Sequence, residues 1–170
     1  MARRTSNPSA VAVDVAGVAV AVTIEVGLVA DPVPCETRKM TPTEKFMRFG
    51  EAFESRNRAA FDAATSVDIS MTPVPGWPDQ GPFVGRDAAW EFMLGTEDAF
   101  DEVLYDGATE SEERDNVVYT CVKRRMRPKG MPEHIEVLLY MVATVAEEGV
   151  ADVRSFLDRG QARETAGLGR

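Results

Sequence analysis

The order of helical and strand patterns along the chain restricts its fold more than any other feature of the sequence. Alternating strand patterns dominate from residue 101 onwards, whereas helical patterns occupy residues 41–57, 59–64 and 86–95. One earlier strand is predicted at 67–74, and the later strands at 101–111, 116–128, 133–147 and 150–157. Helices followed by long antiparallel strands are typical of α+β domains, in which helices cover one face of a sheet. We therefore predict a curved antiparallel sheet packed on N-terminal helices.

Capping residues mark the first and last predicted helices. Residues 41–44 read Thr-Pro-Thr-Glu, a capping box with proline in the first helical turn. An apolar stripe at helical spacing follows this box, at Phe46, Phe49 and Phe53. Near the C-terminus, Asp158 and Gln161 have the spacing of a second capping box, which predicts a short final helix.

Residues 1–39 differ from the rest of the chain. Their acidic and basic residues cancel, so the formal net charge of −9 lies on residues 40–170. Residues 11–30 are almost entirely apolar, but Asp14 and Glu25 interrupt them, which disfavours a membrane-spanning helix and a secretory signal. We predict a poorly ordered extension over 1–39 and one domain over 40–170. Secretion through residues 1–30 is the alternative, and Met40 is an alternative natural start.

Charge and metal-ligating residues exclude several classes of function. Lys and Arg number 19 against 28 Asp and Glu, and so acidic a protein gains nothing from the counterion release that drives nucleic-acid binding. One histidine and two cysteines are too few for a zinc site of the usual kind or for a disulfide framework. We therefore predict no nucleic-acid partner, no membrane association, no metal, no cofactor and a cytoplasmic location.

The predicted strand at 135–146 is apolar on both faces. One face carries Val137, Leu139, Met141, Ala143 and Val145, and the other carries Leu138, Tyr140 and Val142. An antiparallel strand with one face in water should alternate polar and apolar residues, so the outer face needs a cover. A second copy of the sheet would supply it, and we predict a homodimer through this face. The alternative is that the N-terminal extension folds over it.

Five cations fall within residues 123–129. In an antiparallel pair they would lie opposite the acidic residues of 110–113, and opposite charges that face each other across two strands attract. We therefore predict a solvated, charge-paired hairpin, with an anion or phosphate site as the alternative. Cys121, on the same strand, is predicted to be a buried and unreactive thiol.

Four segments of the domain carry a family resemblance. They are the opening helix at 44–57, Gly85-Arg86-Asp87 before a helix, Gly149-Val150 in the last hairpin, and the ending Phe156-Leu157-Asp158-Arg159-Gly160-Gln161-Ala162. With these segments, residues 40–168 resemble the SnoaL-like (polyketide-cyclase-like) family of the nuclear transport factor 2-like superfamily. The resemblance implies a cone-shaped, cystatin-like α+β fold with a deep hydrophobic pocket and frequent dimerisation. Members of the superfamily include polyketide cyclases, ketosteroid isomerases, epoxide hydrolases, dehydratases and binding modules without chemistry.

The resemblance also implies that known catalytic groups are replaced here. Phe49 stands where ketosteroid isomerases have a tyrosine, and Thr72 stands where they have the aspartate base. Ser155 stands where limonene-type epoxide hydrolases have a catalytic aspartate. A phenyl ring has no proton to move, and a threonine hydroxyl is no base near neutral pH. We therefore expect a pocket without the usual acid–base groups of the family.

The residues assigned to the pocket by this resemblance are mostly apolar, and they are Phe49, Met71, Thr72, Trp77, Trp90, Met141 and Ser155. Tryptophan and methionine suit a flat hydrophobic ligand, although both tryptophans could equally close the core. Asp79, His134 and Ser155 are the candidates for catalysis, with the alternative that Asp79 is an exposed turn residue and His134 an exposed residue at the entry of a strand. We predict a hydrophobic small-molecule partner and a cofactor-free enzyme of isomerase, cyclase, dehydratase or hydrolase type. The alternative is a dimeric binding module without chemistry.

Overall fold

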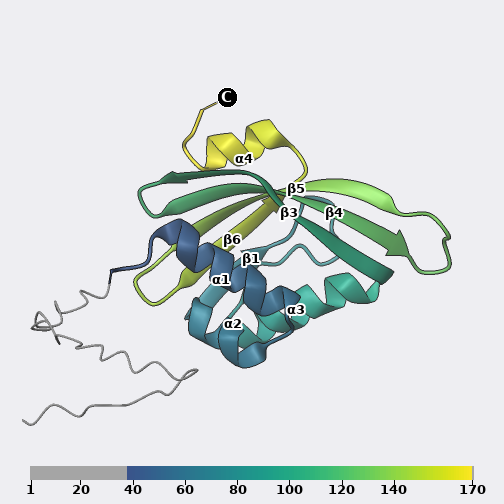
Figure 1. Ribbon diagram of the computed structural model, residues 1–170, viewed down its shortest axis with the longest axis horizontal. Helices are drawn as coiled ribbons and strands as arrows, with labels where there is room; N and C mark the ends of the chain where they lie inside the picture. The colour runs from purple at the N-terminus through teal and green to yellow at the C-terminus, as the bar shows by residue number, and fades with distance from the viewer. Residues whose placement is uncertain (1–37, 170) are drawn as a thin grey trace, which may run out of the picture. The chain divides into compact units, whose positions relative to one another are not determined.

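A six-stranded sheet runs through residues 38–169, the part of the chain that the computed structural model describes. Its strands are β1 (Thr65–Thr72), β2 (Phe83–Val84), β3 (Phe100–Arg114), β4 (Val117–Pro128), β5 (Ile135–Val145) and β6 (Val150–Phe156). Their order across the sheet is β2-β1-β6-β5-β4-β3 (Figure 1). The predicted extension lies outside the described residues, apart from Arg38 and Lys39, and it stays a prediction.

The sheet is mixed, which corrects the prediction of an antiparallel sheet in one detail. Four of the five strand pairings are antiparallel, but β1 and β6 run parallel, with Met71 opposite Val153. The three long antiparallel pairings join consecutive strands, as hairpins do. A parallel pairing needs a long crossover instead, and here residues 73–149 supply it between β1 and β6.

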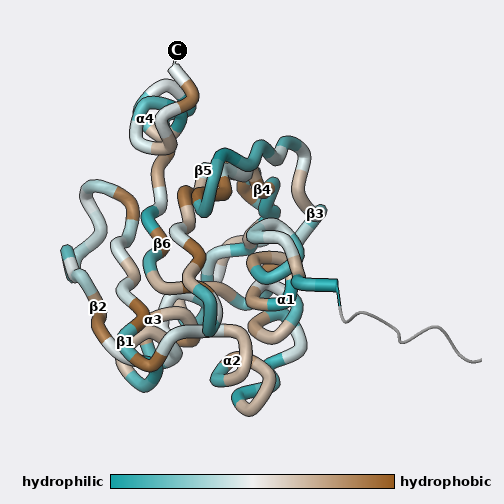
Figure 2. The backbone as a smooth tube through the Cα atoms, turned by 90° about the vertical axis from the view of Figure 1, so that its left-hand side faces the viewer, coloured by the Kyte–Doolittle hydropathy of each residue, from teal (hydrophilic) through white to brown (hydrophobic). Residues whose placement is uncertain are grey.

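Three helices lie on one face of the sheet and a fourth lies on the other (Figures 1 and 2). The first three are α1 (Pro42–Glu54), α2 (Arg58–Ala64) and α3 (Arg86–Asp98), and the last is α4 (Arg159–Thr165). The capping box predicted at the start of α1 forms, because the Thr41 hydroxyl accepts from the Glu44 amide and the Glu44 carboxylate accepts from the Thr41 amide. None of the helices in this part of the chain is long and apolar enough to cross a membrane.

The main core lies between α1, α2, α3 and the inner face of the sheet. Phe61 is fully buried at its centre, with its ring centroid 5.7 Å from that of Phe49 and 5.0 Å from that of Trp90. The apolar stripe of α1 therefore packs on α2 and α3 as well as on the sheet. This packing fixes the helices above one end of the inner face, and the remaining part of that face borders a cavity.

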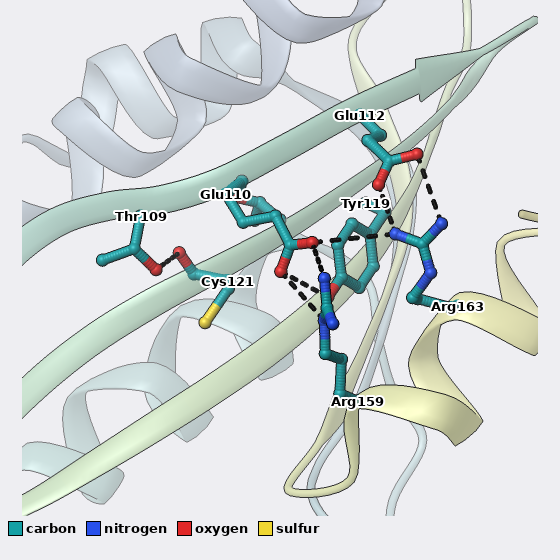
Figure 3. A network of polar contacts seen from close by, with 8 residues as sticks. Thr109, Glu110, Glu112, Tyr119, Cys121, Arg159 and Arg163 are labelled. Carbon is teal, nitrogen blue, oxygen red and sulfur yellow. Dashed lines mark hydrogen bonds and ion pairs between the residues drawn. The ribbon is translucent and has the colours of Figure 1, made fainter. Parts of the chain in front are cut away.

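The outer face of the sheet is covered in part by α4. Tyr119 and Val142 on this face are buried together with Ala162 and Ala166 of the helix and the turn after it. Arg159 pairs with Glu110, and this hydrogen bond is the main reason that the pKa of Glu110 lies below its ordinary value (Figure 3). The chain's own last helix thus covers surface that the sequence assigned to a second copy or to the extension. Leu138, beyond this cover, is 43% exposed.

Candidate functional site

A cavity of about 520 Å³ lies against the inner face of the sheet. Side chains from α1, α3, β1 with the loop after it, and the four strands β3 to β6 line it. Its apolar wall includes Phe46, Phe53, Phe92, Val122, Val137 and Leu139. Cavities of this size and character are typical of sites that bury a small organic molecule.

The alternation of side chains along the strands decides which residues reach this cavity. On β5, Val137, Leu139 and Met141 line it, whereas Leu138 between them points to the opposite face. On the neighbouring strand β4, the residues opposite these three are Arg124, Val122 and Thr120, and all of them line the cavity too. The inner faces of adjacent strands therefore form one continuous wall.

Five of the seven residues assigned to the pocket from the sequence line this cavity, and they are Phe49, Met71, Trp77, Met141 and Ser155. The other two lie elsewhere. Trp90 is buried in the core, edge-on to Phe53 at 6.1 Å between ring centroids. Thr72 ends β1, opposite Arg154, and does not belong to the cavity wall.

The three catalytic candidates are not brought together. Asp79 is exposed on the loop between β1 and β2, away from the cavity wall. His134 lies before β5, where its Nε2 is 2.9 Å from a carboxylate oxygen of Glu102. Ser155 alone borders the cavity. Among the residues of 38–169, no group of three His, Cys, Asp or Glu side chains is placed to hold a metal ion.

The structure places a polar group in the cavity that the sequence did not indicate. The Tyr105 hydroxyl donates a hydrogen bond to Glu97, and Arg56 donates another to Glu97 at 2.7 Å. The guanidinium carbon of Arg124 lies 4.8 Å from the centre of the Tyr105 ring, in cation–π contact. Burial raises the pKa of Tyr105 well above its ordinary value, a smaller effect of Arg124 lowers it, and the bond to Glu97 raises it again.

This group brings a buried cluster of hydrogen-bonding side chains to a wall that is mainly apolar. The Tyr105 phenol is protonated at neutral pH, and its proton is directed at Glu97. Glu97 brings a carboxylate whose side chain is only 11% exposed. Arg124 brings N–H donors, and its Nε atom is buried without a hydrogen-bond partner among the described residues. The cavity can therefore hold an apolar body and bind a polar oxygen at one wall.

The alternation of side chains along β4 is the sequence signal that could have placed Arg124 in the cavity. Thr120, Val122, Arg124 and Met126 share one face of β4, and three of these four are apolar or small. An arginine on such a face stands out only when the two faces of the strand are read separately. Tyr105 and Glu97 gave no such signal, because their meeting depends on how α3 packs against β3.

Solved structures of other proteins share this architecture. An NTF2-like protein from Burkholderia xenovorans aligns over 75% of this chain and 98% of its own, at 21% identity and a TM-score of 0.61. A putative SnoaL-like polyketide cyclase from Jannaschia sp. aligns over 76% and 92%, at 14% identity and a TM-score of 0.58. The protein TerC, co-crystallized with polyporic acid, aligns over 74% and 98%, at 12% identity and a TM-score of 0.61.

No protein-family model and no curated protein matches the sequence. The similarity is therefore one of three-dimensional structure, and it extends over nearly the whole length of the solved proteins. The chain has the nuclear transport factor 2-like fold, as its resemblance to the SnoaL-like family predicted.

Proposed function

We propose that this protein binds a small, largely apolar organic molecule in the cavity beneath its sheet. The observation that carries the proposal is the cavity itself, about 520 Å³ in volume and lined mainly by aromatic, aliphatic and methionine side chains. Burial of apolar surface stabilises such a complex by roughly 25 cal/mol for each Å² removed from water. The co-crystallization of TerC with polyporic acid supports the proposal, since a small molecule was combined there with a protein of the same fold.

Filling the cavity should abolish this binding. We expect Leu139→Trp to weaken the binding of N-phenyl-1-naphthylamine, a neutral fluorescent probe, by at least about tenfold, because the indole occupies space that the ligand needs. Leu139 lines the cavity, so the change acts where the ligand would lie. The measurement is the rise in probe fluorescence on titration with protein.

The matched control for this variant is Leu138→Trp. Leu138 is the neighbouring residue of β5, has the same side chain and is 43% exposed on the outer face. Its replacement should leave probe affinity within about twofold of wild type, since surface changes rarely disturb a distant site. Equal losses in both variants, or wild-type protein that does not bind the probe, would contradict the proposed function.

A second candidate function is proton transfer on the bound molecule, and the placement of Glu97 and Arg124 in one cavity favours it. Glu97 would take a proton from the carbon next to a ligand carbonyl. The electron pair of the broken C–H bond would form a C=C bond, and the π pair of the carbonyl would move to its oxygen, where Arg124 would stabilise the enolate. Where the ligand has a C=C bond next to that carbon, a dienolate forms, and return of the proton to its γ-carbon would complete an isomerisation without a cofactor.

Hydrogen–deuterium exchange tests this second candidate. With 2-tetralone in D₂O, wild-type protein should speed exchange of the protons next to the carbonyl, as followed by proton NMR. Glu97→Gln should reduce this acceleration by about 100-fold, the usual contribution of a general base. Glu51→Gln, which removes another carboxylate of the cavity wall, should retain most of it. If wild-type protein does not speed the exchange above its rate in buffer alone, proton transfer is contradicted and the proposed function is binding without chemistry.

The homodimer and the cytoplasmic location remain part of the proposal. Leu138 supports a second copy on the outer face, because this leucine is exposed beyond the edge of the surface that α4 covers.

A further inference from the structure

Arg124 differs from every other cation on its strand. Lys123 pairs with Glu136 at 2.7 Å, Arg125 with Asp106 at 2.8 Å, and Arg127 with Asp101 at 3.6 Å. These three form a charge-paired hairpin, as predicted, but their partners are not the acidic residues of 110–113, because the register of β3 and β4 sets Glu110 opposite Cys121. Arg124 lines the cavity, and within residues 38–169 it has no ion pair and no hydrogen bond at Nε.

The neighbouring carboxylate does not satisfy this charge. One oxygen of Glu97 accepts from Tyr105, and the other accepts from Arg56 at 2.7 Å. What Arg124 meets is the face of the Tyr105 ring, which attracts a cation but offers no acceptor for its N–H groups. A buried donor without an acceptor costs free energy that the fold must offset.

An acceptor brought by a ligand would remove this cost. The guanidinium is planar, permanently charged and weakly hydrated, and its N–H groups match a carboxylate through two parallel hydrogen bonds. Aromatic residues of α1 and aliphatic residues of β5 form much of the remaining wall. A half-buried cation with an unpaired Nε, at the edge of a mainly apolar chamber, is complementary to an organic acid with a hydrophobic body.

We propose that the natural ligand carries a carboxylate, and that Arg124 binds it while the hydrophobic body fills the cavity. The proposal rests on the proposed binding function and adds the chemical class of the ligand. Arg124 is then a specificity residue, because a neutral molecule of the same shape leaves its donors unpaired. The Glu97 carboxylate, held by Tyr105 and Arg56, orients the ring that supports the guanidinium.

Competition between two matched molecules tests the proposal. Decanoate and 1-decanol have the same carbon chain and differ in a carboxylate and a hydroxyl. Each is used at pH 7.5, below its micelle concentration, to displace N-phenyl-1-naphthylamine from wild-type protein. We expect decanoate to compete at least about tenfold more strongly, as hydrogen bonds to a charged group contribute more than those to a neutral one.

Two arginine variants locate the effect. Arg124→Met keeps an unbranched side chain and removes the charge. This variant should weaken the competition by decanoate by about 10- to 100-fold, while the competition by 1-decanol should change by less than about threefold. Arg125→Met removes the same charge from the next residue of β4. Because Arg125 points to the outer face, where it pairs with Asp106, this control should not change the preference for decanoate.

The thermal midpoint separates a binding role from a structural one. Ligand-free Arg124→Met should unfold within a few degrees of wild type, because the lost cation–π contact is balanced by removal of a buried Nε donor without an acceptor. Decanoate should raise the midpoint of wild type and of Arg125→Met more than that of Arg124→Met.

Three outcomes distinguish the two proposals. Equal competition by decanoate and 1-decanol in wild type would overturn the carboxylate proposal and leave the apolar cavity function standing. A similar loss in Arg124→Met and Arg125→Met would also overturn it, since the effect would then come from overall charge. Failure of the neutral fluorescent probe itself to bind would instead contradict the proposed function.

Discussion

Phe61→Ala is expected to lower the free energy of unfolding by about 3–5 kcal/mol, the range for removing a fully buried phenyl ring. Phe61 has no exposed surface and contacts aromatic side chains of α1 and α3. Its helix, α2, is short and continues directly into β1, so the ring is what joins α2 to both longer helices. Loss of the ring leaves a cavity that the surrounding rigid aromatics cannot fill.

Chemical denaturation followed by far-UV circular dichroism measures this effect. Met131→Ala is the control, because Met131 is 57% exposed in the turn between β4 and β5 and should change stability by no more than about 0.5 kcal/mol. The slope of the transition should stay the same in both variants if each remains two-state. A loss below about 1 kcal/mol for Phe61→Ala would show that this ring is not the centre of a rigid core.

Local features of the fold were predictable because neighbouring residues encode them. Thr41 and Glu44 cap α1 in the predicted way, and Asp158 caps α4 by accepting from the Gln161 amide at 2.7 Å. Such signals act over three or four residues, and the two-residue alternation of strands is equally local. The predicted order of helices and strands from residue 41 onwards agrees with the structure except at β2, a strand of two residues that pairs with β1 and was not predicted.

Pairings between remote segments were not predictable in the same way. The residues of β1 and β6 do not indicate that the two strands run parallel, because their relative direction is set by the crossover between them. The cover of Tyr119 and Val142 by α4 is also a remote contact. A strand with two apolar faces shows that a cover is needed, but it does not show which segment supplies it.

The candidate site shows the same division between local and remote information. Met141 and Ser155 were assigned to the pocket from family resemblance, and both line the cavity. Trp90, which was assigned in the same way, packs on Phe61 in the core, because apolar character alone does not separate a cavity wall from a core. Arg124 was predicted to be a solvated cation like its neighbours, because residues 123–129 were treated as one charged segment and the two faces of the strand were not separated.

Gly149→Ala is expected to destabilise the protein by about 3 kcal/mol or more, the combined effect of overpacking and backbone strain. A β-carbon at this position would lie 2.5 Å from the carbonyl oxygen of Ala64 and 2.9 Å from the amide nitrogen of Thr65. Both neighbours are backbone atoms at the junction of α2 and β1, so no side chain can move aside. The φ of +151° is a further obstacle to any residue but glycine.

This clash lies where the parallel pairing begins. Val150, the next residue, is opposite Thr65 in the β1–β6 register, and the register shifts between Thr65 and Ser70. Moving the last hairpin away from Ala64 would therefore separate the first residues of the two strands. We expect the loss to appear as a lower midpoint in urea, together with faster amide exchange in β1 and β6 than in β3 and β4.

Gly95→Ala is the matched control, with an opposite expected sign. Gly95 lies in α3, and a β-carbon there meets nothing within 4 Å; alanine should stabilise the helix by about 0.5–1 kcal/mol. Both substitutions restrict the unfolded chain to the same extent. The difference between the two variants therefore isolates the native-state clash at Gly149, and equal effects would show that the last hairpin does not press against the start of β1.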